Sequence, residues 1–189
     1  MDVVLTEADL TLRPWTARDA DALLSLAGDR ELRRWTSHRV DDLEDAARWI
    51  AAQETGWRTR ERLSFAMVAR GRIAGHIVLK QPSRPRGVAE IGYWTGAPAR
   101  GQGVASRALA MLTLWAFDPG RGEGPTRLEL VHNAGNPASC RVAEKAGYAL
   151  QAVLPRRPPH PLEGHLHARD RGAAPARPGV PRAPGAGAA

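Results

Sequence analysis

The chain is organised around RGQGVA, residues 100–105, a glycine-rich loop between two strongly patterned segments. Residues 88–95 before it (VAEIGYWT) alternate like a β-strand, and the residues after it carry apolar side chains at helical spacing. The loop therefore begins a helix, whose first N–H groups lack internal partners and lie at the positive end of the helix dipole. Gly101 and Gly103 let the backbone approach a ligand closely, and Arg100 adds a cation. The pattern predicts a phosphate-binding turn.

Three kinds of glycine loop bind phosphate groups, and sequence details distinguish them. A P-loop is excluded because its lysine and following hydroxyl residue are missing; the only lysines are Lys80 and Lys145. A dinucleotide fingerprint fits poorly because Ser106 occupies the place of its third glycine, and no acidic residue ends a second strand about 20 residues further on. The third kind fits. Arg-x-x-Gly-x-Ala at residues 100–105 resembles the pyrophosphate-binding signature of the GNAT acetyltransferases, which hold acetyl-CoA with it.

Four further segments extend this resemblance over most of the chain. They are LTLRPW (10–15), EIGYW (90–94), NPAS (136–139) and EKAGY (144–148), and they resemble the Rim-type branch, the ribosomal-protein alanine N-acetyltransferases. The resemblance implies a GNAT fold of the α/β class, with a mixed central sheet flanked by helices. In that fold the fourth and fifth strands splay apart, and the pantetheine arm of the cofactor enters the gap.

The resemblance implies acetyl-CoA as co-substrate, and no metal is expected. The residues expected to bind acetyl-CoA are Tyr93, Trp94, Thr95, Arg100, Gly101, Gln102, Gly103, Val104, Ala105 and Asn136. A GNAT domain is expected over residues 8–170, followed by a disordered Ala/Pro/Gly/Arg-rich tail at 171–189. This tail is either a natural extension or GC-rich coding sequence translated out of frame. His165 and His167 share one face of a predicted strand, but two histidines alone do not make a metal site.

The implied reaction is direct transfer of acetyl from the thioester to a primary amine. Glu90 is the candidate general base, acting through water; the alternative is a structural carboxylate paired across the sheet. Ser139 is the candidate general acid for the CoA thiolate, because Ala143 stands where many GNAT enzymes carry a tyrosine. The alternative for Ser139 is a purely local hydrogen bond. Asn136 either bonds the pantetheine amide or is only a helix N-cap.

Two further features bear on the reaction. Gly92 in the middle of the predicted strand indicates a bulge or a close backbone approach. A backbone N–H near Trp94, freed by such a bulge, is the expected donor to the oxyanion. Cys140 has no histidine and acid arrangement to activate it, and it is expected to be a small buried thiol.

The acceptor favoured by the resemblance is a protein N-terminal amine. A small-molecule amine, such as an antibiotic or a polyamine, is an alternative, and so is a non-catalytic acyl-CoA-binding domain. Trp35, Trp49 and Trp57 either line the acceptor pocket or belong to the core.

Composition sets outer limits. The 189 residues suit one domain, and a hydrophobic content of 43% favours a globular fold. No run of about 18 apolar residues predicts a membrane span, the start of the chain lacks a basic signal-peptide region, and the single cysteine agrees with a reducing compartment. A cytoplasmic protein, monomeric or homodimeric, is expected. Residues 155–189 supply +4 of the net charge of +7, from six arginines and two acidic residues (6 − 2). These residues contain no aromatic residue besides histidine, so specific nucleic-acid binding is not expected.

Periodicity predicts the remaining elements. Strands are expected at 11–15, 63–70, 72–80, 88–95, 126–132, 148–153 and 164–169, and helices after Thr16 and over 30–35, 41–53, 104–115 and 137–146. Gly71 is expected to close a tight hairpin between two of these strands.

Overall fold

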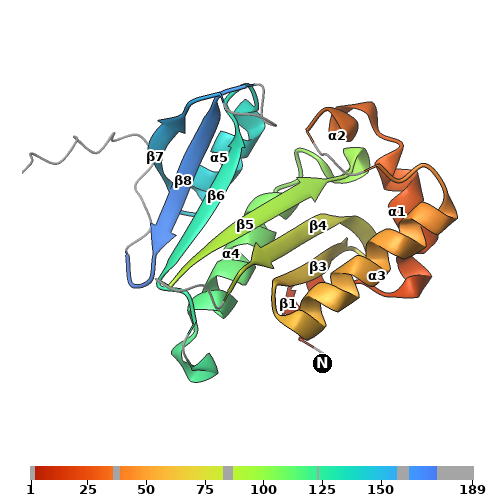
Figure 1. The fold of residues 1–189 in the computed structure, drawn as a ribbon, viewed down its shortest axis with the longest axis horizontal. Coiled ribbons are helices and arrows are strands. Elements are labelled where there is room, and N and C mark those ends of the chain that lie inside the picture. The colour runs from red at the N-terminus through yellow and green to blue at the C-terminus, as the bar shows by residue number, and fades with distance from the viewer. Residues whose placement is uncertain (1–2, 36–38, 83–86, 123, 157–161, 174–189) are drawn as a thin grey trace, which may run out of the picture.

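The fold is built around one central sheet. The computed structural model describes residues 3–35, 39–82, 87–122, 124–156 and 162–173. These residues form one eight-stranded sheet in the order β1-β2-β3-β4-β5-β6-β8-β7, antiparallel except between β5 and β6, which are parallel (Figure 1). The strands are β1 (Leu5–Glu7), β2 (Leu10–Pro14), β3 (Arg62–Ala69), β4 (Arg72–Lys80), β5 (Val88–Thr95), β6 (Arg127–Asn133), β7 (Ala149–Leu154) and β8 (Gly164–Asp170). The predicted α/β fold with a mixed sheet is confirmed.

Helices cover both faces of the sheet. They are α1 (Ala20–Ala27), α2 (Arg30–Trp35), α3 (Leu43–Thr59), α4 (Val104–Phe117) and α5 (Pro137–Lys145), with short 3₁₀ turns at Ala17–Asp19, Ala97–Ala99 and Pro119–Arg121. α1 and α3 pack together on one face, and α4 and α5 lie on the other (Figure 1). The helix predicted over 41–53 continues to Thr59 because Trp57 is buried and its Nε1 donates to the Ser64 carbonyl at 2.8 Å.

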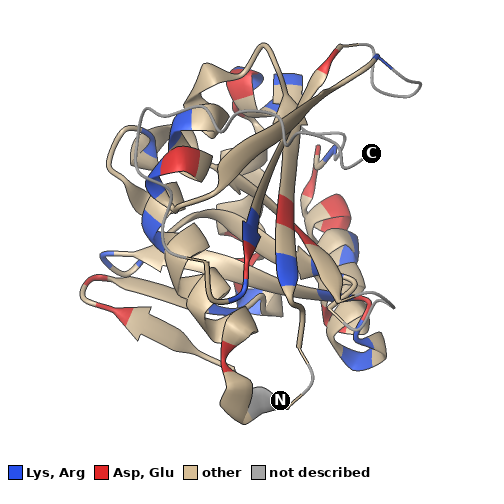
Figure 2. Cartoon of the chain, turned by 90° about the vertical axis from the view of Figure 1, so that its left-hand side faces the viewer, with Lys and Arg blue, Asp and Glu red and all other residues tan. Residues whose placement is uncertain are grey.

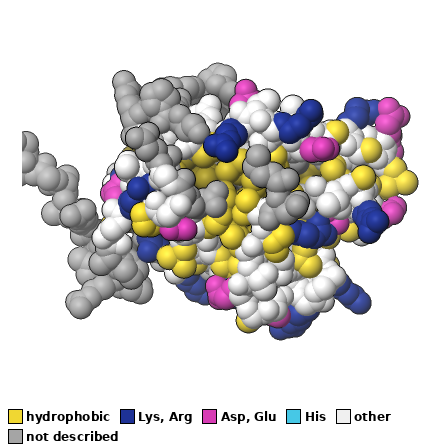
Figure 3. Space-filling model, turned by 90° about the horizontal axis from the view of Figure 1, so that it is seen from below, with side chains coloured by type: hydrophobic (Ala, Val, Ile, Leu, Met, Phe, Trp, Pro, Cys, Tyr) yellow, Lys and Arg dark blue, Asp and Glu magenta, His cyan; other side chains and the backbone are white. Residues whose placement is uncertain are grey.

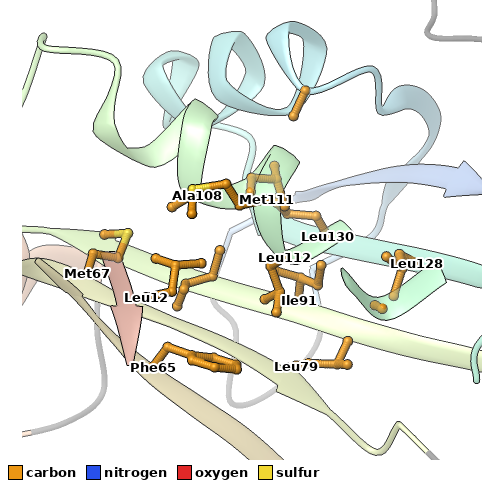
Figure 4. Close-up of a cluster of buried hydrophobic side chains, with 14 of the residues drawn as sticks. Leu12, Phe65, Met67, Leu79, Ile91, Ala108, Met111, Leu112, Leu128 and Leu130 are labelled. Atoms are coloured by element: carbon orange, nitrogen blue, oxygen red, sulfur yellow. The ribbon is translucent and has the colours of Figure 1, made fainter. Parts of the chain in front are cut away.

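The main core lies between the sheet and α4 (Figure 4). The helix contributes Ala108, Met111 and Leu112, which are buried against side chains from alternate strand positions. The sheet contributes Leu12, Phe65, Met67, Leu79, Ile91, Leu128 and Leu130. α4 packs on β1 to β5, and the cluster continues to Leu128 and Leu130 of β6.

A second apolar cluster fills the other face, beneath α1 and α3. Trp15, Leu23 and Ile50 are buried there, and the half-buried ring of Trp49 packs edge-on against Trp15 with centroids 5.2 Å apart. Trp57, by contrast, belongs to the main core, so one of the three tryptophans considered for a pocket is a core residue.

Turn chemistry agrees with the sequence at the β3–β4 hairpin. Arg70 and Gly71 both have positive φ, 51° and 75°, as the primed two-residue hairpin turn requires. The strand β1 was not predicted; its three residues are largely exposed, so they carry no alternating pattern.

The surface carries charges of both signs. Figure 2 shows basic and acidic residues interspersed over helices and strands on one side, and Figure 3 shows hydrophobic side chains gathered near the middle of the underside. No helix among the described residues is both long and apolar enough to span a membrane. Of the tail predicted to be disordered over 171–189, residues 174–189 lie outside the described residues, while the Arg171 side chain donates to the Pro125 carbonyl.

Candidate functional site

The parallel strands β5 and β6 diverge, and this divergence makes the site. They pair only where residues 88–90 meet residues 127–129, whereas β5 stays paired with β4 as far as Thr95 (Figure 1). On its other edge, β6 is paired with β8 over its whole length, from Arg127 to Asn133. The splayed pair that the sequence resemblance implied is therefore confirmed.

The bulge predicted at Gly92 is wrong. The β4–β5 register runs unbroken from Gly75 opposite Thr95 to Lys80 opposite Glu90. A Cβ on Gly92 would meet only ordinary contacts at 3.5 Å, so no close backbone approach occurs there within the chain. The strands separate because β6 departs with β8, not because β5 is distorted.

Backbone alternation nevertheless leaves donors on the open edge of β5. The N–H of Gly96 donates to the Ala74 carbonyl of β4 at 2.9 Å. Since N–H groups alternate in direction along a strand, the N–H of Trp94 also faces β4, while those of Tyr93 and Thr95 face the gap. We therefore expect the oxyanion donor to be the N–H of Tyr93 or Thr95 rather than that of Trp94, and this role stays a prediction.

The glycine loop lies at the end of this strand and begins α4, as predicted. Gly101 and Gly103 have φ of +74° and +75°, and an added Cβ would meet no atom within 4 Å at either position. Gly103 is the N-cap and supplies no side-chain cap, and the first helical bond runs from Arg107 N–H to the Gly103 carbonyl. The amides of Val104 and Ala105 consequently precede the first helical bond and lack a helical acceptor.

The polar side chains of the loop are engaged within the protein. Arg100 pairs with Asp29, between α1 and α2, and its Nε donates to the Thr95 carbonyl at 3.2 Å. The amide of Gln102 donates to the Pro98 carbonyl at 2.6 Å. Arg100 is thus not the free cation that the sequence suggested; it ties the loop to β5 and to α1. The backbone, rather than this arginine, presents positive potential to the open space.

A hydrogen bond crosses the gap from β5 to α5. The Tyr93 hydroxyl donates to Ser139 Oγ at 3.0 Å, and the N–H of Ser139 donates to the N-cap side chain of Asn136 at 3.2 Å. Burial raises the pKa of Tyr93 to about 12, so the phenol keeps its proton at neutral pH. Ser139 and Asn136 were named from the sequence as candidate site residues, but the hydrogen bond from the Tyr93 hydroxyl to Ser139 was not predicted. Asn136 is therefore the N-cap of α5, and its hydrogen bond to the pantetheine amide stays a prediction.

Glu90 lies on the opposite face of β5 from Tyr93, because strand side chains alternate. Its carboxylate accepts from Lys80 Nζ at 2.5 Å, and both side chains are partly exposed. This is the cross-strand pair that the sequence left open as an alternative. A catalytic role for Glu90 stays a prediction.

An aromatic group occupies the same face as Glu90. The Nε1 of Trp15 donates to His76 Nδ1 at 3.1 Å, and His76 stacks on Trp94 with ring centroids 5.8 Å apart. Across the gap, the ring of Trp35 at the end of α2 reaches within 3.9 Å of the position a Cβ would take on Gly135, before α5. α2 and the β6–α5 loop therefore border the same opening.

Cys140 is only half-buried, whereas the sequence predicted a buried thiol, and two histidines lie beside it. Its Sγ lies 3.5 Å from His132 Nε2 and 3.2 Å from His165 Nδ1. Burial raises the pKa of the thiol, so these contacts do not make it a thiolate nucleophile at neutral pH.

Among the solved structures that share this fold are three acetyltransferases. A candidate ribosomal-protein-serine acetyltransferase from Vibrio cholerae has a TM-score of 0.78 and 24% identity, covering 89% of this chain and 97% of its own. RimL, a ribosomal L7/L12 alpha-N-protein acetyltransferase, has a TM-score of 0.78 and 19% identity, covering 90% and 95%. MccE, a microcin C7 self-immunity acetyltransferase in complex with acetyl-CoA and AMP, has a TM-score of 0.78 and 19% identity, covering 87% and 93%. A sequence search of curated proteins finds no match.

The family follows from a match that includes the whole of this site up to α5. Residues 9–149 match the family model described as an acetyltransferase (GNAT) domain. That range contains the glycine loop, the diverging strands and the Tyr93–Ser139 hydrogen bond. The chain therefore belongs to the GNAT family and is an acetyl-CoA-dependent acetyltransferase.

Proposed function

We propose that this enzyme transfers acetyl from acetyl-CoA directly to a protein N-terminal amine. One observation carries the proposal. Beyond Glu90, one edge of β5 is unpaired, with the glycine loop at the end of the strand and the Tyr93–Ser139 hydrogen bond crossing the gap. An extended thioester laid along this edge can reach phosphate donors at one end and two hydroxyls at the other.

The residues present fit acetyl-CoA. There is open space in front of Gly101 and Gly103, which a Cβ would fill. The N–H groups at the start of α4 adjoin this space and suit pyrophosphate oxygens. Along the open edge, the backbone groups of Tyr93 and Thr95 suit the amides of an extended pantetheine arm. Acetyl-CoA supplies the acetyl group already activated as a thioester.

The chain's own residues then have three tasks. The N–H of Tyr93 or Thr95 donates to the carbonyl oxygen as negative charge develops on it. Ser139 gives its proton to the departing sulfur, and the Tyr93 hydroxyl, already hydrogen-bonded to Ser139 Oγ, stabilises the oxygen that loses it. As the products leave, the CoA thiol keeps that proton and the Ser139 oxygen takes a new one from water.

The attacking amine must lose a proton, and Glu90 is the proposed acceptor through water. Its carboxylate is partly exposed, so water reaches it, and it lies beside the point where β5 and β6 separate. The ion pair with Lys80 holds the carboxylate in place at this point of the strand.

The acceptor class rests on two supports. Structural neighbours are described as acting on ribosomal proteins, one at an alpha-amine, although their identity of 19–24% carries the fold alone. In addition, Asp29 and Glu90 beside the opening are already paired with Arg100 and Lys80, which disfavours a polyamine. A small-molecule amine is the second candidate, favoured by the neighbour solved with AMP, and a non-catalytic acyl-CoA-binding domain is the third.

The test has two stages. Acetyl-CoA is titrated calorimetrically into the native chain and into the double variant Gly101→Asp, Gly103→Asp, which places negative charge at the loop. Peptides with a free or a blocked α-amine, spermidine and an aminoglycoside are then incubated with acetyl-CoA and analysed by mass spectrometry. Binding lost in the variant, with acetyl only on free α-amines, supports the proposal. A folded chain that acetylates only the small molecules contradicts it.

A further inference from the structure

Four potential metal ligands from α5, β6 and β8 lie close together. His132 comes from β6, Cys140 from α5, and His165 and His167 from β8. Their ligand atoms all lie within 4.8 Å of one another. We propose that these residues bind a zinc ion through three imidazole nitrogens and one thiolate.

The topology brings the ligands together. In the β6–β8 register, His132 lies directly opposite His165, and His167 is two residues along on the same face. α5 packs on β8, which brings Cys140 over that face. The sequence showed only the pair on β8, because the other two ligands are separated from it by a strand and a helix.

The distances are close to those of an occupied site. Zinc bound at about 2.3 Å by sulfur and about 2.0–2.1 Å by nitrogen gives ligand–ligand edges of about 3.5 Å in a tetrahedron. Sγ of Cys140 is already 3.5 Å from His132 Nε2 and 3.2 Å from His165 Nδ1. Only small side-chain movements are then needed to complete the tetrahedron.

Backbone carbonyls orient two of the rings. Nδ1 of His132 lies 2.8 Å from the Asn133 carbonyl, and Nδ1 of His167 lies 3.5 Å from the Tyr148 carbonyl. A carbonyl only accepts hydrogen bonds, so each Nδ1 carries the proton and each Nε2 keeps its lone pair. This is the outer-shell arrangement that holds histidine ligands of metals in position.

His167 provides independent evidence for a ligand. Its side chain is fully buried, and its Nε2 has no hydrogen-bond partner among the described residues. An unsatisfied polar atom in the interior is costly and calls for an explanation. A zinc ion accepting that lone pair supplies one.

The ligand chemistry selects the metal and its role. Nitrogen and thiolate ligands in a tetrahedron suit Zn²⁺, and four protein ligands leave no open position, as in structural zinc sites. On binding, Cys140 releases its thiol proton to solvent and forms the zinc–sulfur bond. The ion then joins α5 to the paired strands β6 and β8, one residue away from Ser139.

The test uses the full-length chain without a histidine tag. After dialysis against a weak chelator, metal content is measured by mass spectrometry, and Co²⁺ is titrated into the metal-free protein. We expect one zinc per chain and a Co²⁺ spectrum with tetrahedral and thiolate charge-transfer bands. Removing a ligand should weaken binding by more than the roughly 10- to 100-fold typical of outer-shell changes.

Matched variants separate ligation from folding. Cys140→Ser and His167→Asn should lose zinc, whereas Ser139→Ala, on the same helical turn, should keep it; circular dichroism checks that each is folded. A folded native chain that binds neither zinc nor Co²⁺ overturns the proposal. So does zinc affinity in Cys140→Ser equal to that of the native chain. The readouts are independent of acetyl transfer.

Discussion

Alanine at Gly103 should weaken acetyl-CoA binding far more than it lowers stability, and alanine at Gly71 should lower stability alone. Both glycines have φ of +75°, and at neither position would an added Cβ meet an atom within 4 Å. The two variants therefore share the same backbone strain and create no clash within the protein. Only Gly103 begins α4, whereas Gly71 lies in the β3–β4 hairpin.

The magnitudes follow from these two facts. A left-handed backbone costs an L-residue about 1–2 kcal/mol, and replacing glycine recovers about 0.4–1 kcal/mol through the unfolded state. The net loss of about 0–1.6 kcal/mol corresponds to a Tm decrease of at most roughly 6 °C for a chain of this size. At Gly103 the methyl group also enters the space that phosphate must occupy. Losing one hydrogen bond to a charged oxygen costs about 1.5–3 kcal/mol, or about 10- to 100-fold in Kd.

The assay compares calorimetric titration with acetyl-CoA and thermal unfolding for the native chain and both variants. Similar decreases in Tm, with weakened binding only in Gly103→Ala, are expected. If Gly71→Ala weakens binding equally, the effect comes from general destabilisation. If Gly103→Ala binds as the native chain does, phosphate does not lie against this loop and the reasoning is refuted.

Three further changes test other parts of the structure. Glu90→Gln should reduce kcat by about 10²- to 10⁴-fold. Lys80→Met breaks the same ion pair but keeps the carboxylate, so it should reduce kcat far less. Equal losses of kcat in steady-state assays would indicate that the pair is only structural. Tyr93→Phe removes only the hydroxyl that donates to the candidate acid, and should lower kcat by about 5- to 10-fold while leaving Kd for acetyl-CoA unchanged; a change confined to Kd contradicts this role. Burial raises the pKa of Asp19, but the hydrogen bonds from Arg13 and its other partners outweigh it and hold the pKa below the ordinary 3.8. Asp19 therefore stabilises the fold above pH 3.8 and ceases to do so as pH falls through its lowered pKa. Asp19→Asn should lower the free energy of unfolding by about 3 kcal/mol at pH 7, but by little once the native carboxyl is protonated. Urea unfolding at pH 7 and under acid conditions checks the difference.

Local sequence patterns predicted the parts of the site that local geometry determines. The positive φ at Gly101 and Gly103 needs glycine, and the apolar spacing after them needs a helix, so the loop was visible in the sequence. Asn136 followed by Pro137 likewise marks a helix start, which the structure confirms.

Contacts between distant segments could not be predicted in this way. Arg100 meets Asp29 across 71 positions, and Tyr93 meets Ser139 across 46. The second depends on how β6 and α5 leave β5, and the first on how the segment after α1 reaches the glycine loop; no periodicity encodes either arrangement. The error at Gly92 has the same origin: the sequence attributed the gap to a defect in one strand, whereas the partner strand turns away.

The helix α5 connects the proposed chemistry to the proposed zinc site. Ser139 and Cys140 are consecutive, so their side chains diverge by about 100° around the helix. The first meets Tyr93 of β5, and the second meets His132 and His165 of the β6–β8 unit. Zinc at Cys140 therefore fixes the helix that carries the candidate acid, while the glycine loop belongs to α4. Removing zinc should accordingly lower kcat and leave the Kd for acetyl-CoA unchanged, and calorimetry beside steady-state kinetics checks this; a parallel loss of both indicates general unfolding instead.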